Sequence, residues 1–182
     1  MKFPLGNTTK IVFILLFILG VSGFSPSLKA SEDSTEYAVK AAFIYNFSKF
    51  VSWPEESNAE PFIIGVLGDD PFGDIWKEIQ TKSVRGRPIT VKRCGEDIFL
   101  ASECQVLFIG FSDQTNLNKV LDLLKGKPIL TIGDFPQFAE TGGMIAFYDS
   151  EKKIRFAINP ESCRKAGLVV SSNLLKLAKI VK

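Results

Sequence analysis

After residue 60, the chain alternates between continuous apolar runs and segments whose apolar residues have helical spacing. Three continuous apolar runs have the length of strands, Phe62–Leu67, Val106–Gly110 and Pro128–Ile132, and such runs are typical of strands buried on both faces. Leu117–Leu124 has apolar residues at helical spacing and ends before Gly126, a residue common just after a helix. This alternation predicts a single α/β domain with a mainly parallel, doubly wound (Rossmann-like) sheet and flanking helices.

Both ends of this region depart from the alternation. Tyr37–Val51 contains no Gly or Pro and is followed by a Trp-Pro pair, which predicts a helix that stops there. Near the other end, Met144–Tyr148 and Ile154–Ile158 have strand composition and predict a C-terminal β-hairpin. A last helix is predicted over residues 171–180. Shorter segments of strand composition are Ile89–Arg93 and Leu168–Val170.

The first thirty residues differ in composition from the rest. A basic start, an apolar segment from Ile11 to Gly20 and a small residue at Ala30 are typical of a cleavable secretory signal peptide. The apolar segment falls short of the roughly 20 residues that cross a bilayer, and an uncleaved N-terminal anchor is the alternative. We expect residues 1–30 to be a signal peptide and residues 31–182 to be one periplasmic domain without membrane insertion of its own.

Charge and composition exclude several classes of function. Removal of residues 1–30 takes away three lysines and no acid, which lowers Lys plus Arg from 22 to 19 against 20 Asp plus Glu, a formal charge of −1. A domain without a basic excess is not expected to bind nucleic acid. The chain has no histidine, which excludes Ser-His and Cys-His catalytic pairs and histidine ligation of zinc or haem. No cofactor is predicted.

Four aspartates lie near the carboxyl ends of predicted strands: Asp69, Asp70, Asp113 and Asp134. Doubly wound folds bind ligands at the carboxyl ends of their strands, and an acidic cluster there would hold Mg²⁺. Aspartate is also the ordinary residue of turns and helix caps, and we favour this second interpretation. We therefore predict no metal site and no catalytic residues.

Three cysteines, Cys94, Cys104 and Cys163, would enter an oxidising compartment after export. Cys94 ends one predicted strand and Cys104 precedes another, so a disulfide between them is predicted if these strands are neighbours. Two separate thiols are the alternative, because the sequence does not show how far apart their Cα atoms lie. We expect Cys163 to be a buried apolar residue rather than a nucleophile.

Arg155 alternates with Ile154 and Phe156 along a predicted strand, so its side chain faces away from theirs. An arginine in this position is a candidate for binding a small anion. Its alternative role is to protect a sheet edge from pairing with other chains.

Several segments resemble, in the expected order, those of the YfiR-like periplasmic family. They are Val39–Val51 with its Trp-Pro pair, Cys104 with the strand that follows it, Gly142–Phe147, Ile154–Asn159, Ala166–Leu168 and Ser171–Ala178. The likeness covers nearly the whole chain after residue 30, which makes it more specific than any single motif.

The resemblance implies an exported regulator without catalysis. The best-understood members bind the periplasmic sensor domain of an inner-membrane diguanylate cyclase and hold it inactive, which lowers cyclic di-GMP and biofilm formation. Members are found as homodimers and carry two disulfides, of which three cysteines permit one. Aromatic residues of the opening helix and the turn after it are candidates for contact with the partner, with core packing as the alternative: Phe43, Tyr45, Phe47 and Trp53.

A periplasmic solute-binding module is the alternative function. Its ligand would be a small anion, a nucleotide or an amino acid. We expect such a ligand near the carboxyl edge of the sheet or beside Arg155.

Overall fold

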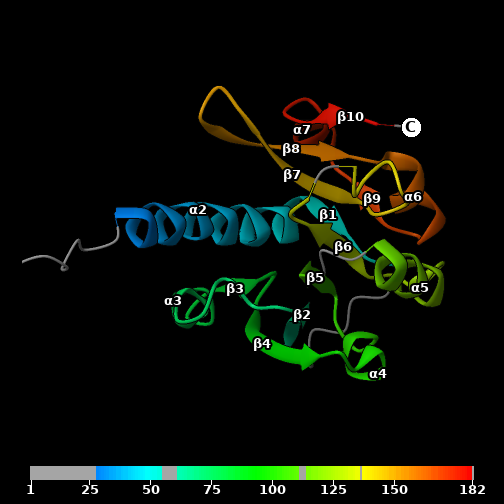
Figure 1. The fold of residues 1–182 in the computed structure, drawn as a ribbon. Helices are drawn as coiled ribbons and strands as arrows, with labels where there is room; N and C mark the ends of the chain where they lie inside the picture. Colours follow the sequence, from blue (N-terminus) through cyan, green and yellow to red (C-terminus); the bar gives the residue numbers. More distant parts are fainter. Residues whose placement is uncertain (1–27, 55–60, 111–113, 136, 182) are drawn as a thin grey trace, which may run out of the picture. The chain divides into compact units, whose positions relative to one another are not determined.

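The computed structural model describes residues 28–54, 61–110, 114–135 and 137–181 (Figure 1). The chain divides into two units, Met1–Glu32 and Asp33–Lys182, and each is described by itself. Of the first unit, only the beginning of helix α2 (Leu28–Phe50) is described, so most of the predicted signal peptide lies outside the described residues. No helix in the described ranges combines the length and hydrophobicity that a membrane crossing needs.

An eight-stranded sheet forms the centre of the second unit. Its strands follow one another in space in the order β10-β8-β7-β6-β5-β2-β4-β3. The pairs β4–β2, β2–β5, β5–β6 and β6–β7 are parallel. The pairs β3–β4 and β7–β8 are antiparallel. The strands are β2 (Phe62–Gly68), β3 (Ser83–Val84), β4 (Arg87–Gly95), β5 (Val106–Gly110), β6 (Leu130–Gly133), β7 (Ile145–Ser150), β8 (Lys153–Ile158) and β10 (Lys179–Ile180). The predicted α/β class and the mostly parallel sheet are confirmed.

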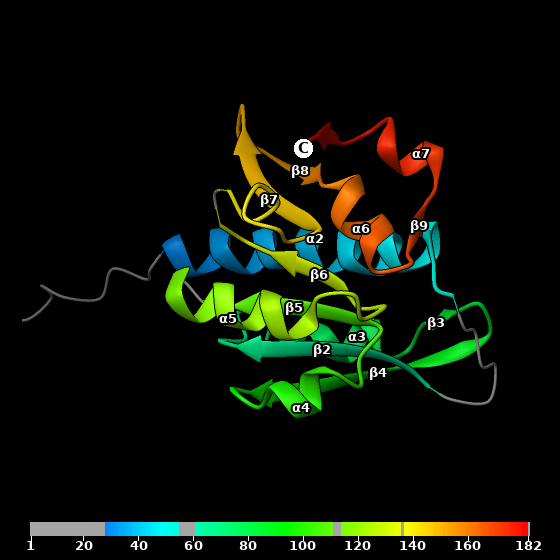
Figure 2. The same cartoon turned by 90° about the vertical axis from the view of Figure 1, so that its right-hand side faces the viewer.

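Helices cover both faces of this sheet, and Figure 2 shows α4 and α5 on one side of β2, β5 and β6 and α2 on the other. Residues of α2, α3, α6 and α7 share an aromatic-rich core with one face. Residues of α4 and α5 share a second, mainly aliphatic core with the other face. The shorter helices are α3 (Ile75–Ile79), α4 (Ile98–Ala101), α5 (Gln114–Leu124), α6 (Pro160–Lys165) and α7 (Ser172–Leu175).

The central strands are apolar at every position because both of their faces are buried. In β5, Val106 and Phe108 contact the first core, whereas Leu107 and Ile109 contact the second. Since side chains alternate between the faces of a strand, a sheet between two helical layers leaves no position for a polar side chain there. This is why continuous apolar runs located the central strands correctly.

The structure differs from the predictions mainly near the ends of the chain. Helix α2 begins at Leu28, well before the predicted Tyr37, since the polar segment between them contains no Gly or Pro to stop a helix. Two strands, β1 (Val51–Ser52) and β9 (Val169–Val170), pair antiparallel in a small separate sheet. The predicted last helix is wrong beyond α7, because residues 179 and 180 form β10 beside β8. Apolar spacing alone does not distinguish a short strand from a helix.

Candidate functional site

The edge where strands β2, β5 and β6 end is the first candidate site. The chain leaves β2 toward α3 on one face of the sheet and leaves β5 toward α5 on the other, so a crevice opens between the two strand ends, as is common at ligand sites in α/β sheets. A cavity of about 230 Å³ lies here, bordered by Tyr37, Asp69, Phe108 and Asp134. At Gly110, the end of β5, a Cβ atom would lie 2.1 Å from the backbone oxygen of Asp69, so only glycine fits there.

Helix α2 places a lysine against this edge. The ammonium of Lys40 lies 2.7 Å from both carboxylate oxygens of Asp134 and also donates to Glu36. Tyr37 donates its hydroxyl to the same carboxylate at 3.1 Å, and the Lys40 ammonium lies 4.8 Å from the centre of the Tyr37 ring. Lys40 is only 4% exposed. These contacts hold α2 against the turn after β6, a segment distant in sequence.

The protonation of this cluster follows from its contacts. Burial alone would lower the pKa of Lys40, but its hydrogen bonds to Asp134 and Glu36 outweigh that effect and raise the pKa above its ordinary value. Burial and the neighbouring Asp134 carboxylate raise the pKa of Tyr37 to about 12. At neutral pH the lysine is therefore charged and the tyrosine neutral, so neither acts as a general base.

Asp70, another aspartate of the predicted acidic group, is engaged in contacts within its own turn and with Arg93. The carboxylate of Asp70 accepts hydrogen bonds from the Phe72 backbone and the Trp76 indole at 3.0 and 3.1 Å, and pairs with Arg93 at 2.6 Å. It therefore organises the turn before α3, the role that aspartate ordinarily has in turns. Asp113 lies outside the described residues. No group of three metal-ligating side chains is present in the part of the chain that the structure describes.

Two of the four aromatic contact candidates belong to the core. The Phe47 ring packs 4.9 Å from the Phe156 ring and is fully buried. Trp53 packs 5.3 Å from Phe62 and donates its indole N–H to the backbone oxygen of Gln105 at 3.1 Å. In this structure both side chains have the alternative role of core packing, because both rings are buried.

The other two aromatic candidates reach the surface in part. The ring of Phe43 is half-buried and packs 5.6 Å from Phe156. Tyr45 is also half-buried, and its ring lies 5.0 Å from the Lys49 ammonium. Its hydroxyl is 3.4 Å from the backbone oxygen of Ser83, so its position links α2 to β3.

Sequence reasoning missed two exposed apolar side chains on neighbouring segments. Phe50 at the end of α2 is 42% exposed and Val169 in β9 is 66% exposed. The backbone oxygen of Phe50 accepts a hydrogen bond from Ser171 at 2.9 Å, so the pairing of β1 with β9 brings the two segments together. We call Tyr45, Phe50 and Val169 the α2–β9 surface. Its apolar residues were visible in the sequence, but only the β1–β9 pairing places Phe50 and Val169 on neighbouring segments.

Arg155 is exposed on β8, directly opposite Tyr148 of β7. Strand β10 pairs with β8 only at Ala157 and Ile158. Within the described residues, the outer edge of β8 at Arg155 is therefore unpaired. A charged side chain at an open edge discourages pairing with another chain, and this position fits that alternative role.

The cysteines are three buried thiols in this structure. Strand β2 lies between β4, which carries Cys94, and β5, which Cys104 precedes. The Cys94 thiol donates to the backbone oxygen of Lys92 and the Cys104 thiol to that of Leu100, and the two thiols are close enough to influence each other's pKa. The Cys104 side chain lies over Gly65 of β2, where a Cβ atom would be 2.5 Å from the Cys104 sulfur. Glycine at this position therefore leaves room for Cys104 against the sheet. The bridge itself stays a prediction.

Burial also determines the reactivity of these thiols. It raises the pKa of Cys104 and of Cys163 to about 12, and that of Cys94 above its ordinary value. The nucleophilic form of cysteine is the thiolate. At neutral pH none of the three is an activated nucleophile.

Comparison with family models places these features in a known family. The model of the YfiR/HmsC-like family matches residues 37–179, from α2 to β10. The match includes the buried cluster around Lys40, the cysteine pair and the α2–β9 surface. Members of this family are periplasmic and regulate diguanylate cyclase signalling rather than catalysing a reaction themselves. The chain therefore belongs to the YfiR/HmsC-like family of periplasmic regulators.

Proposed function

We propose that this protein is a non-enzymatic periplasmic regulator that binds the periplasmic sensor domain of an inner-membrane diguanylate cyclase and represses the enzyme. Repression lowers cyclic di-GMP and biofilm formation. The observation that carries the proposal is the family match over residues 37–179. Export by a signal peptide at residues 1–30 is part of the proposal, and the strand order supports a doubly wound sheet in the mature domain.

Repression requires a rigid protein that recognises one conformation of its target. A regulator shifts a target from 1:99 to 99:1 only if it binds the inactive conformation more tightly by about 5.5 kcal/mol. The two cores on opposite faces of the sheet and the anchoring of α2 by Lys40 and Asp134 support such a scaffold. Chemistry on a substrate is not needed.

We infer that the α2–β9 surface contacts the sensor domain. Exposed apolar side chains next to one another favour a protein interface, where they lose their contact with water. Phe50 and Val169 come from segments that hydrogen-bond to each other, and the half-buried Tyr45 lies about one turn and a half before Phe50 on the same helix. Aromatic residues are common at the centres of interfaces. The partner surface is therefore expected to be apolar.

Complementation of a deletion strain tests both levels of the proposal. Deletion of the gene in the native host is expected to raise cyclic di-GMP, and the intact gene to restore the low level. Phe50→Glu and Val169→Glu are expected to fail in this restoration, because each buries a charge in the interface. Phe99→Glu is the matched control, since Phe99 is 82% exposed on α4, over the other face of the sheet.

The outcomes separate the function from the surface. An unchanged cyclic di-GMP level after deletion would contradict the proposed repression. A rise that is corrected equally by all three variants would retain repression and reject the α2–β9 surface. Each variant protein is first checked for periplasmic accumulation, so that loss of folding is not mistaken for loss of contact.

We also propose a Cys94–Cys104 disulfide and a homodimer in the periplasm. The closeness of the two thiols, each of which influences the pKa of the other, supports the bridge, and the family resemblance supports the dimer. Protein exported and denatured without reductant is expected to have a mass lower by two hydrogens than the reduced chain. Two free thiols at Cys94 and Cys104 would remove the bridge, and a monomeric mass in light scattering would remove the dimer.

A further inference from the structure

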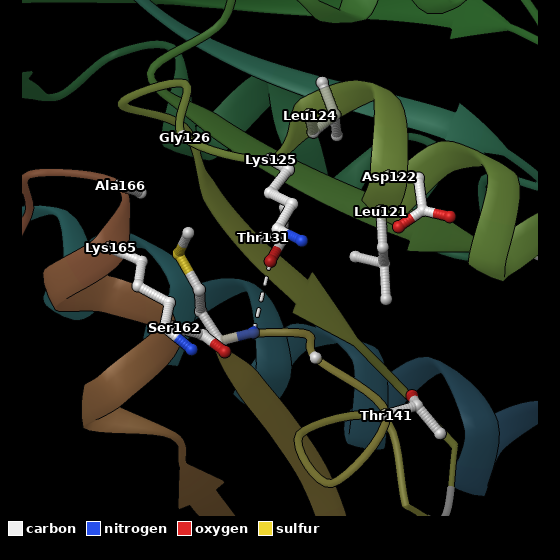
Figure 3. Close-up of a pocket in the computed structure, with 12 residues that line it drawn as sticks. Leu121, Asp122, Leu124, Lys125, Gly126, Thr131, Thr141, Ser162, Lys165 and Ala166 are labelled. Atoms are coloured by element: carbon white, nitrogen blue, oxygen red, sulfur yellow. Dashed lines mark hydrogen bonds between the residues drawn. The ribbon is translucent and has the colours of Figure 1, made fainter.

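A second cavity lies at the opposite edge of the sheet, where strands β6 and β7 begin. It has a volume of about 230 Å³ and is bordered by the end of α5, the start of β6, the loop before β7 and helix α6 (Figure 3). It is therefore separate from the cavity beside Asp134, which lies where the strands end. All residues that border it belong to the described part of the chain.

Two glycines and one hydrogen bond determine the course of the backbone around this cavity. Gly126 and Gly142 turn the chain on two sides with φ of 75° and 111°, and a Cβ atom at either would have no neighbour within 4 Å. The buried hydroxyl of Thr131 accepts a hydrogen bond from the Met144 backbone at 3.1 Å, drawn as the dashed line in Figure 3. This bond fixes the loop before β7 to β6.

Two lysines border the cavity from different helices. Figure 3 shows Lys125 at the end of α5 and Lys165 on α6. Lys125 has no ion-pair partner among the described residues, and Lys165 lies 3.5 Å from Glu161, whose carboxylate also binds Arg164 at 2.8 Å. Both ammonium groups therefore keep donors for a further acceptor.

The remaining border combines hydroxyl groups with an apolar wall. Thr141 and Ser162 add hydroxyls, and Leu121 and Met144 are among the apolar residues. The volume of about 230 Å³ is below the roughly 300–1,000 Å³ of sites for drug-sized ligands, which favours a ligand smaller than a nucleotide. Asp122 also borders the cavity, and its charge disfavours ligands with several negative charges.

We propose that this cavity binds a small organic monoanion, a carboxylate with a short hydrocarbon chain. Lys125 and Lys165 bind the carboxylate, with the Ser162 hydroxyl as a further donor. The hydrocarbon chain lies against Leu121 and Met144. This site is independent of the α2–β9 surface, and its failure leaves the proposed repression untouched.

Calorimetric titration of the mature protein with sodium hexanoate tests the proposal. Saturable 1:1 binding is expected, with about tenfold weaker affinity in Lys125→Met and in Lys165→Met, since each removes a charge-assisted hydrogen bond. Inorganic phosphate and citrate are expected to bind more weakly than hexanoate, as is hexanol. Lys119→Met is the matched control, because Lys119 is exposed on the same helix and does not border the cavity.

Three results would overturn the site. The first is the absence of saturable hexanoate binding to the intact protein. The second is binding that both lysine variants retain in full, which would leave these lysines only their interaction with the helix dipoles. The third is an equal loss in Lys119→Met, which would indicate attraction by overall charge. Circular dichroism of each variant confirms that the exposed substitutions leave the fold intact.

Discussion

Two cavities of similar size lie at opposite ends of the parallel strands. They differ in whether the basic side chains around them are paired with carboxylates. At the edge where strands end, Lys40 is buried and paired with Asp134, and Arg93 is paired with Asp70. At the edge where strands begin, Lys125 and Lys165 are exposed and border an open space. At the first edge both of these basic side chains are paired with carboxylates, whereas the two lysines of the second edge keep hydrogen-bond donors for a further acceptor.

This difference shows that a fold's usual ligand edge can serve stability instead. The ends of parallel strands are the customary place for a ligand. Here a residue of α2 supplies the cation that a ligand would otherwise bring to Asp134. The edge with the more obvious chemistry in the sequence therefore anchors a helix, and the edge with less obvious chemistry remains open.

The largest expected effect is the loss of the buried cation. Lys40→Met should lower the free energy of unfolding by about 3 kcal/mol, because removal of one partner leaves a partly buried carboxylate without its counter-charge. Urea denaturation followed by circular dichroism measures this. The control is Lys77→Met, which breaks an exposed pair with Asp74 and should change stability by less than about 0.5 kcal/mol. Equal effects would show that the Lys40 pair is no anchor.

A smaller loss of stability is expected when a side chain is added at Gly110, where two backbone segments approach closely. Gly110→Ala should lower the free energy of unfolding by about 2 kcal/mol, because its Cβ atom would overlap the Asp69 backbone. Gly126→Ala at the open edge is the comparison. It meets no atom but adopts a positive φ of 75°, so its cost should be only about 1 kcal/mol. A reversed order would contradict the contrast between the edges.

The protein should also lose stability at alkaline pH because of the ionisable groups around Asp134. The raised pKa of Lys40 means that its ion pair contributes fully below the ordinary lysine pKa and is lost as pH rises through the folded value. Tyr37 acts in the same direction, because the unfolded tyrosine ionises near pH 10 and the folded one at about 12. Stability measured by denaturation should fall above pH 10, and less steeply in Tyr37→Phe. An identical slope in that variant would show that Tyr37 is not protected.

The smallest effect is expected at the open edge. Simultaneous replacement of Lys125 and Lys165 by methionine should change the free energy of unfolding by less than about 0.5 kcal/mol, since both side chains are exposed. Thermal denaturation of the purified protein measures it. If this double variant lost as much free energy of unfolding as Lys40→Met, the charged residues at the two ends of the strands would contribute equally to stability.

The sequence was most informative for the central strands, because burial on both faces requires an apolar residue at nearly every position. Strands β2, β5 and β6 must be apolar on both faces, so their apolar runs located them and indicated the α/β class. The aspartates were correctly interpreted as turn residues in the case of Asp70. The boundaries of α2 and the last strand were missed, because short segments take their structure from whatever they pair with.

The candidate sites show the limit of the same reasoning. Phe47 and Phe50 lie three residues apart in one apolar helix, yet one is in the core and the other is exposed. The sequence pattern does not separate them, since the helix is apolar around most of its circumference. Which side faces the sheet depends on where α2 packs.

By itself, the amino-acid sequence determined the class of fold, the absence of histidine chemistry and the resemblance to a regulatory family, because these depend on composition and local order. Only the tertiary structure decided that Lys40 meets Asp134, that Cys104 lies over Gly65 and that α5 and α6 border a cavity between two lysines. Each of these contacts joins segments far apart in the chain, and local preferences carry no information about distances that only the packing of the sheet defines.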